Sequence, residues 1–355
     1  MKGAPLLRLL TVGSIVADIR VEAPHLPQRG GDVIGSAASI NAGGGFNVLA
    51  AAARNGLRSV FAGRHGVGQF GDRIRAELAR EKITALLPPS SDGDSGFCLV
   101  VVEPDGERTF ITSPGVEAEI GDRNLEKIEL GPSDAVFVSG YDLNYPRLGG
   151  EIARWIAAWR KECFLAVDPG PLVASIPGAD LDVALARANL LTLNRGEAAL
   201  LAGADQIGDI AARLMRRLAR RALLAVRDGA EGCFLCGGGI AEGLIHIPAP
   251  IVKAVDTTGA GDTHTGVLLA AIAAGVDLIS AATRANAAAA ISVTRRGPAT
   301  APSTKELDDF LASSRNSNSG RKNKTTAAQT MRVHHENGRQ DHDVSHQPQD
   351  LSRPH

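Results

Sequence analysis

The sequence predicts an α/β protein with a mostly parallel central sheet, helices on both faces of that sheet, and a small β lid. Three observations lead to this prediction. Strands and helices alternate steadily from about residue 133 onward, which is typical of a parallel sheet covered by helices. A strand, a loop, a helix and another strand follow one another near the N-terminus. A hairpin and a stretch rich in Gly and Pro, at 97–112 and 14–40, do not fit this alternation and form the predicted lid.

The N-terminal elements follow from local signals. Gly13 and Ser14 close the first strand, and the Ala-rich run up to Arg54 favours a helix. Asn55-Gly56 is the kind of left-handed cap that ends such a helix. Pro104-Asp105-Gly106 between two apolar runs indicates a hairpin. The predicted elements are a strand at 6–12, a helix at 48–54, a strand at 59–63 and hairpin strands at 97–103 and 108–112.

The C-terminal half shows the alternation most clearly. Short apolar runs read as strands, and longer runs of good helix formers separate them. The predicted strands are 135–139, 164–168, 190–194 and 222–226, and the predicted helices are 149–161, 207–220 and one that follows Gly261 and reaches about residue 274.

Composition limits the class of protein. The 355 residues are 44% hydrophobic and carry a formal net charge of −1, which argues against a dedicated nucleic-acid binder. No apolar run reaches 18 residues and the N-terminus lacks a signal-peptide pattern, so we expect a cytoplasmic protein without membrane contact. Residues 1–312 are the predicted folded domain. Residues 313–355 are almost without large apolar side chains and form a predicted disordered tail, which holds five of the nine histidines.

The segment 256–266 carries the chemistry. Gly259, Ala260 and Gly261 leave backbone N–H groups uncovered at the start of a helix, where the helix dipole favours an anion. Asp262 stands in that first turn. A carboxylate beside an anion site suits phosphoryl transfer, because the attacking hydroxyl loses a proton while charge develops on the phosphoryl oxygens. The alternative is that Asp262 only complements the helix dipole.

The run Asp256–Gly266 resembles the C-terminal signature D-T-[TV]-G-A-G-D-x-[FA]-x-G of the ribokinase-like (PfkB-type) carbohydrate kinase family. It departs only at His264, where an aromatic or small apolar residue is more usual. The resemblance implies a three-layer ribokinase-like fold and ATP as the phosphate donor. It also implies that Asp262 is the catalytic base and that the amides of Gly259, Ala260 and Gly261 form the anion hole.

A second match concerns the sugar side of the site. Residues 41–50 resemble the family pattern G-G-x-x-x-N-x-A, with Ala42 in place of the first Gly and Ala50 one residue late. The resemblance implies that this loop touches the sugar, and that Asn47 bonds its hydroxyls; capping of the following helix is the other interpretation. Two carboxylate oxygens of one Asp suit a vicinal diol. The substrate residues implied in this way are Asp18, Gly43, Gly44 and Asn47, with Asp32 as a lid residue near the same pocket.

Further matches concern the nucleotide and its ions. Asn194 and Glu197 resemble the family's N-x-x-E motif, which implies that they organise Mg²⁺ through water; a helix capping box is the alternative. The resemblance also implies that Gly229 and Gly232 let the backbone pass close to ATP, and that Asn286 lines the adenine pocket. Asp256 and Thr258 match part of a monovalent-cation site, which suggests K⁺ activation.

The resulting prediction is an ATP-dependent phosphotransferase that phosphorylates a hydroxyl of a sugar or sugar-like substrate. A nucleoside kinase of the same fold is an alternative, with Phe46, Phe97 and Phe110 as candidate stacking residues. A phosphofructokinase-like member would use a basic residue such as Arg108 for a substrate phosphate. A catalytically silent ligand-binding member is the third alternative. An exposed lid could also pair with its copy in a homodimer.

Overall fold

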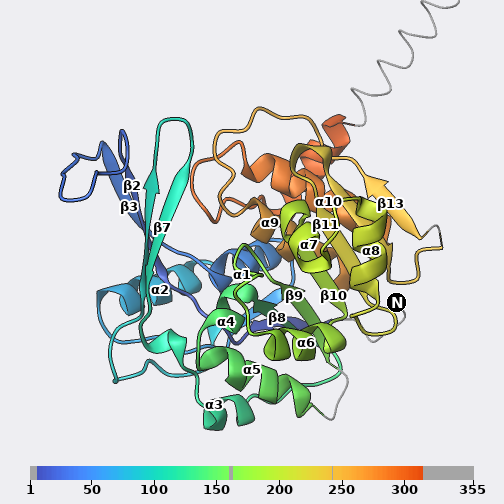
Figure 1. Ribbon diagram of the computed structural model, residues 1–355, viewed down its shortest axis with the longest axis horizontal. Helices are drawn as coiled ribbons and strands as arrows, with labels where there is room; N and C mark the ends of the chain where they lie inside the picture. Colours follow the sequence, from blue (N-terminus) through green and yellow to red (C-terminus); the bar gives the residue numbers. More distant parts are fainter. Residues whose placement is uncertain (1–5, 160–162, 242, 315–355) are drawn as a thin grey trace, which may run out of the picture. The chain divides into compact units, whose positions relative to one another are not determined.

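A computed structural model describes residues 6–159, 163–241 and 243–314 of the chain (Figure 1). The chain divides into two units, Met1–Asp308 and Asp309–His355. The sheets, and all the helices labelled below, belong to the first unit. Residues 304–314 are helical. The predicted disordered tail therefore lies, beyond residue 314, outside the described residues, and both its disorder and the boundary at residue 312 stay predictions.

Nine strands form the large sheet in the order β13-β12-β11-β10-β9-β8-β1-β4-β5. All neighbours from β11 to β5 are parallel, and β12 and β13 continue the sheet as antiparallel strands. The chain extends from β1 to β4 and β5, and then returns to the other side of β1 with β8. Ligands of open α/β sheets bind outside the carboxyl ends of the strands at such a reversal. The strands are β1 (Arg8–Thr11), β4 (Arg58–Phe61), β5 (Thr84–Ala85), β8 (Asp134–Ser139), β9 (Phe164–Asp168), β10 (Leu190–Asn194), β11 (Leu223–Arg227), β12 (Cys233–Gly237) and β13 (Leu244–Ile247).

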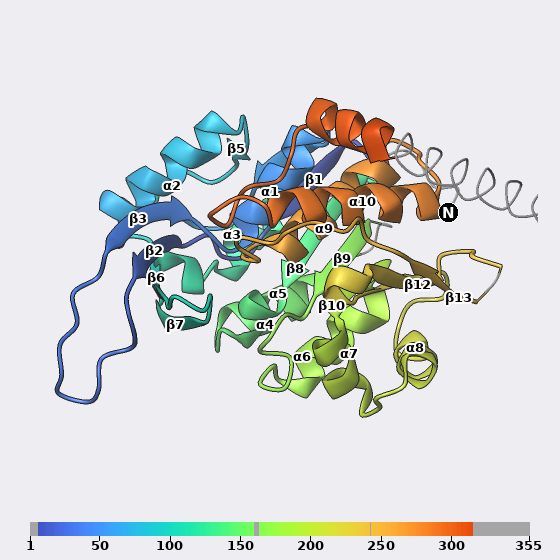
Figure 2. The ribbon, with the colours of Figure 1, turned by 90° about the horizontal axis from the view of Figure 1, so that it is seen from above.

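Two hydrophobic clusters cover the two faces of this sheet. Along β1, Leu9 points into one cluster and Leu10 into the other, as the period of two in a strand requires. The cluster of Leu9 includes α1 (Gly45–Arg54), α2 (Gln69–Arg80), α9 (Ala260–Ala273) and α10 (Leu278–Ser292). The cluster of Leu10 includes α3 (Asp122–Glu126), α4 (Gly140–Asn144), α5 (Leu148–Ala157), α6 (Gly178–Arg187), α7 (Arg195–Ala202) and α8 (Ile207–Met215). Figure 2 shows the resulting three layers, with the sheet between the two groups of helices.

A separate four-stranded sheet has the order β3-β2-β6-β7. Its strands are β2 (Ala17–Glu22), β3 (Ala37–Ala42), β6 (Phe97–Val102) and β7 (Arg108–Ser113), and Figure 1 shows it beside the large sheet. It is built from the two segments predicted as the lid, so the predicted architecture is confirmed. The remaining short elements are the 3₁₀ turns η1 (Val116–Ala118) and η2 (Gly229–Glu231). Among the described residues, none of the helices has the length and apolar character needed to cross a bilayer.

Candidate active site

The start of α9 has the form of an anion cradle. Gly259 precedes the helix with φ = 71°, and a Cβ at this position would lie 2.1 Å from the carbonyl oxygen of Pro298, so only glycine fits there. The first i→i−4 hydrogen bond of the helix runs from the amide of Thr263 to the carbonyl of Gly259, at 2.8 Å. The amides of Gly261 and Asp262 therefore have no acceptor within the helix and face the site with the positive end of its dipole.

Asp262 forms a hydrogen bond with Asn47, which lies far from it in the sequence. The side-chain amide of Asn47 donates to Oδ2 of Asp262 at 3.0 Å. Gly266 makes this contact possible, because a Cβ there would lie 2.5 Å from the carbonyl oxygen of Val48 and would push α9 away from α1. The structure thus brings together the two motifs that carry the sequence resemblance.

Asp18 lies on β2, with its carboxylate directly over the loop that precedes α1. A Cβ on Gly43 would lie 2.1 Å from Oδ2 of Asp18, so the glycine leaves room for that carboxylate. Gly44 is the N-cap of α1 and has φ = 64°. Asp32 is different: it is exposed in the loop between β2 and β3, and no hydrogen bond or ion pair within the described ranges joins it to the other predicted site residues.

Both acidic groups of this centre keep partial solvent access, but the protein atoms around them raise their pKa values. Burial, together with the charge of Asp262, raises the pKa of Asp18 to about 7. Burial also raises the pKa of Asp262 to about 6, against the lowering effect of the Asn47 amide. The nearby Asp168 carboxylate raises the pKa of Asp262 further and the Arg227 guanidinium lowers it. A carboxylate with a pKa near 6 suits a general base that works near neutral pH.

Arg227 is a central residue for which the sequence motifs predicted no role. Its Nη1 donates to Asp168 Oδ2 at 2.8 Å, to Thr192 Oγ1 at 2.9 Å and to Thr265 Oγ1 at 3.1 Å. A Cβ on Gly261 would lie 3.3 Å from Cζ of Arg227, so the guanidinium lies directly beside the anion cradle. Arg227 and Asp168 are the last residues of β11 and β9, and the carboxyl ends of parallel strands are the signal that could have found them.

Asn194 and Glu197 form a complete capping box at the start of α7. Oδ1 of Asn194 accepts from the amide of Glu197 at 2.9 Å, and Oε2 of Glu197 accepts from the amide of Asn194 at 2.7 Å. The helix capping box, which was the alternative interpretation of this pair, is therefore present in the structure. Burial, and then the charge of Asp168, raises the pKa of Glu197, whose Oε2 also lies 3.8 Å from Nη2 of Arg227.

No cluster of three metal-ligating side chains occurs among the described residues. Mg²⁺ in phosphoryl-transfer sites commonly keeps several waters and binds through one or two carboxylates and the substrate phosphates. The carboxylates of Glu197 and Asp168 lie 3.8 and 2.8 Å from the guanidinium of Arg227, so both face the same part of the site.

The predicted nucleotide residues lie together around β12 and β13. Gly229 and Gly232 have φ values of 56° and 103°, and a Cβ on Gly232 would lie 2.1 Å from the carbonyl oxygen of Ile247. Asn286 on α10 is buried and donates to that same carbonyl at 2.8 Å. Gly232 and Asn286 therefore fix the chain after β13, while space is open at Gly229.

The residues matching a monovalent-cation site do not fit a K⁺ ion. Oδ1 of Asp256 accepts from the amide and the hydroxyl of Thr258, at 2.9 and 2.7 Å. Oδ2 accepts from Nη1 of Arg20 at 2.5 Å and from the amide of Gly297 at 3.1 Å. Burial alone would raise the pKa of Asp256, but these hydrogen bonds hold it at about 2. The carboxylate already has a donor for each of its roughly four acceptor positions.

Two further side chains near the acidic centre were missed by sequence reasoning. Tyr141 lies in the first turn of α4, and burial together with the charge of Asp262 raises its pKa to about 12. Cys98 lies opposite Asp18 in the register of β6 and β2, and burial raises its thiol pKa. The one departure from the signature, His264, is fully buried, and this burial lowers its pKa to about 3, so the ring is neutral.

A cavity of about 390 Å³ lies between the lid strands and the loop after α10. Its lining includes Arg20, Asn41, Phe46 and Thr300, but neither Asp18 nor Asp262. The acidic centre formed by Asp18 and Asp262 therefore lies outside this cavity.

Comparison with known proteins agrees with the motifs. The profile of the family described as "pfkB family carbohydrate kinase" matches residues 7–305. An Escherichia coli protein described as "Uncharacterized sugar kinase YegV" is 34% identical over 312 residues, which cover 84% of this chain and 92% of the relative. A ribokinase of Haemophilus influenzae is 28% identical over 85% of this chain and 98% of its own length.

Solved structures show the same fold. The crystal structure of a ribokinase from Thermotoga maritima superposes with a TM-score of 0.71 at 24% identity, covering 86% of this chain and all of that one. The structure of a fructokinase from Vibrio cholerae, bound to fructose, ADP and calcium, gives a TM-score of 0.68 at 22% identity, covering 86% of this chain and 99% of that one.

Proposed function

The chain belongs to the pfkB family of carbohydrate kinases, and on that basis we propose that Asp262 is the base that activates a hydroxyl of a sugar or sugar-like substrate for attack on the γ-phosphate of ATP. As a member of this family the protein is an ATP-binding phosphotransferase with an alcohol as acceptor. The assignment of individual residues below is our proposal.

One observation carries the proposal: the carboxylate of Asp262 accepts a hydrogen bond from Asn47 at 3.0 Å, in the first turn of a helix in which the amides of Gly261 and Asp262 lack an acceptor. In-line transfer needs a base on the acceptor oxygen and a cradle for the phosphoryl oxygens at neighbouring positions. Asp262 takes the hydroxyl proton, the hydroxyl oxygen forms the new P–O bond, and the bond from the γ-phosphorus to the bridging oxygen of ADP breaks.

The sugar is expected to lie between Asp18 and Asn47. Oδ1 of Asn47 is buried and has no hydrogen-bond partner among the residues that the structure describes, although an unsatisfied buried acceptor costs about 1–3 kcal/mol. A substrate hydroxyl would satisfy this atom. The two carboxylate oxygens of Asp18 can accept from two adjacent hydroxyls, and Gly43 leaves the room beside them. Asp18 lies on the lid, so closure of the lid would bind the diol and exclude water together.

The transferred phosphoryl group is expected between the start of α9 and the guanidinium of Arg227. Of the predicted amides at 259–261, that of Ala260 donates to the carbonyl of Thr257 at 3.3 Å, so the amides of Gly261 and Asp262 are the ones expected to bind the phosphoryl oxygens. Three hydrogen bonds hold Arg227 in a fixed position, so its charge needs no reorganisation when negative charge develops on the phosphoryl oxygens. Arg227 also balances Asp168 and Glu197, which would otherwise oppose the binding of a polyphosphate.

ATP is expected along the carboxyl ends of β10 and β11, towards Gly229 and the segment that Asn286 fixes after β13. Mg²⁺, when bound with ATP, neutralises charge on the β- and γ-phosphates. Glu197 and Asp168 would accept hydrogen bonds from the water shell of the ion. Asn194 contributes by orienting Glu197 through the capping box.

A panel of ribose, fructose, 2-keto-3-deoxygluconate and adenosine, assayed for ADP release, tests this function. Asp262→Asn keeps an acceptor for Asn47 and should lower kcat by roughly 10²–10⁴-fold without unfolding the protein. Asp182→Asn is the matched control, because Asp182 is an exposed carboxylate on α6 that pairs with Arg217, away from the acidic centre. Turnover by Asp262→Asn at the control's rate would remove Asp262 from its role.

The nucleoside alternative receives less support. Of its three candidate stacking residues, Phe46 is fully buried in the core and Phe97 packs against Phe70, with ring centroids 5.2 Å apart. Phe110 is exposed on the lid. A preference for adenosine over the sugars in the panel would favour this alternative. ADP release with none of the substrates, together with measurable sugar binding, would favour a silent ligand-binding member.

We also propose the lid as a site of self-association. β3 and β7 are the edge strands of the small sheet, and exposed Ile40, Phe110 and Ile111 lie on them. Light scattering of the wild type and of Ile111→Lys would reveal a dimer that depends on this sheet.

A further inference from the structure

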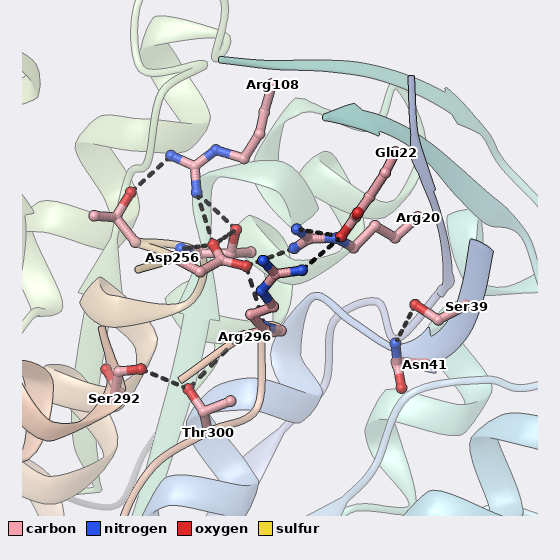
Figure 3. Close-up of polar contacts among 12 residues, drawn as sticks. Arg20, Glu22, Ser39, Asn41, Arg108, Asp256, Ser292, Arg296 and Thr300 are labelled. Atoms are coloured by element: carbon pink, nitrogen blue, oxygen red, sulfur yellow. Dashed lines mark hydrogen bonds and ion pairs between the residues drawn. The ribbon is translucent and has the colours of Figure 1, made fainter. Parts of the chain in front are cut away.

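We propose that arginines of the lid replace the monovalent cation of this site, so that this kinase works without K⁺ and its lid directly orders the anion cradle. The inference rests on the proposed function of the α9 N-terminus. The side chains involved are Arg20 on β2, Arg108 on β7 and Asp256 in the loop before α9 (Figure 3).

Arg20 and Asp256 form a buried ion pair between the lid and the kinase core. The side chains of Arg20 and Asp256 are 16% and 6% exposed, and their charged atoms are 2.5 Å apart. Nη1 of Arg108 lies 3.5 Å from the other carboxylate oxygen of Asp256. A buried carboxylate needs a compensating charge, and here two guanidinium groups supply it. A K⁺ ion at the same carboxylate would meet two positive charges and no free acceptor position.

Arg108 also contacts the residues that shape the cradle. Its Nη1 donates to the hydroxyl of Thr258 at 2.6 Å, and its Nη2 donates to the hydroxyl of Thr257 at 2.9 Å. These threonines lead into Gly259, the N-cap of α9. The hydroxyl of Thr258 in turn donates to Asp256, so a continuous hydrogen-bonded chain joins β7 of the lid to the turn that presents the phosphate-binding amides. With both of its Nη atoms engaged, Arg108 is a positioning residue rather than a ligand for a substrate phosphate.

The neighbouring Arg296 provides an internal comparison. Its side chain is 73% exposed and pairs with Glu22 at 3.5 Å, and Figure 3 shows it beside the Arg20–Asp256 pair. It has the same charge as Arg20 and lies in the same region. Within the described residues it has no direct hydrogen bond or ion pair with Asp256 and is linked to it only through Glu22, which also lies 3.5 Å from Arg20. Arg296→Met is therefore a matched control for the loss of one positive charge.

The experiment compares KCl with choline chloride at equal ionic strength. For the wild type we expect kcat to differ by less than about twofold and the melting temperature of the free enzyme to stay within about 1 °C. Arg20→Met and Arg108→Met should each lower kcat by about tenfold or more, and K⁺ should restore part of the loss, because the exchange leaves acceptor positions on Asp256 or Thr258. Arg296→Met should keep the kcat and the salt response of the wild type.

Several outcomes would overturn the inference. These are a wild-type kcat stimulated tenfold by K⁺, a melting temperature raised by several degrees by K⁺ alone, or full activity in both lid variants. The melting temperature can be measured without turnover, so it tests the inference even when the sugar that the enzyme phosphorylates is not in the panel. Absence of turnover with every sugar and salt would count against the proposed function, whereas K⁺-dependent turnover would count only against the arginine replacement. Arg20→Lys keeps the positive charge. It serves as the second variant at this position if Arg20→Met loses activity because it misfolds.

Discussion

The acidic limb of the pH–rate profile offers the most direct test of Asp262 as the base. With a pKa of about 6, the carboxylate is about nine-tenths ionised at pH 7 and about one-tenth ionised at pH 5. For a pKa that stays near 6 when ATP and sugar are bound, we expect kcat to fall about tenfold between pH 8 and pH 5. A carboxyl group of ordinary pKa would keep about nine-tenths of the rate at pH 5, so the two cases differ clearly.

The assay measures ADP by chromatography of quenched samples at saturating ATP and sugar, which avoids the pH response of coupling enzymes. ATP itself also titrates in this pH range, and Asp262→Asn separates its effect from that of the base. The residual rate of this variant should no longer show the acidic decline that the base causes. Asn47→Ala removes a hydrogen bond that lowers the pKa of Asp262, so its limb should move to higher pH. A wild-type rate that stays flat down to pH 5, or a limb that persists unchanged in Asp262→Asn, would refute the reasoning.

Three further predictions concern the sugar side. Calorimetry of Asn47→Ala should show a larger loss of affinity for the sugar than for ATP. A larger loss for ATP would contradict the assignment of the loop at 41–50 to the sugar. Gly43→Ala should raise the KM for the sugar severalfold, because its Cβ would displace the carboxylate of Asp18, whereas Gly208→Ala on α8 has nothing within 4 Å and should match the wild type. Burial raises the folded-state pKa of Asp18 from 3.8 to about 7, so its charge destabilises the fold increasingly as pH rises from about 4 to 7. Asp18→Asn should therefore raise the melting temperature at pH 8 more than at pH 5 while weakening sugar binding, and an equal effect at both pH values would contradict this.

The sequence predicted the sheet, the lid and the two main motifs, because each has a strong local signal. Element ends were less accurate: the helix expected to reach 161 ends at Ala157, and the one expected to reach 220 ends at Met215. Arginine favours helix in isolated peptides, so the predicted helices were extended through their Arg residues. In the folded protein, tertiary packing decides where a helix ends. The helix α2 was missed because its buried residues are few and its exterior is strongly charged, so the periodic signal is weak.

The missed site residues have a different cause. Arg227 and Asp168 belong to the site only because β9, β10 and β11 are adjacent and parallel, which single strands do not reveal. Arg20 and Arg108 reach Asp256 through the register of the small sheet and its placement against the core. For Asn194 and Glu197 the capping box and the ion-organising role use the same residues, and the pattern alone does not separate them.

The contact between Asn47 and Asp262 joins residues 215 positions apart. During synthesis the ribosome must therefore release most of the polypeptide before the base reaches its partner, and contacts of such separation form late. A nascent or truncated chain that ends before α9 carries the sugar-side loop without the phosphate cradle. Under the function proposed above, such a fragment lacks both the base and the phosphate-binding turn, so we expect it to transfer no phosphate from ATP.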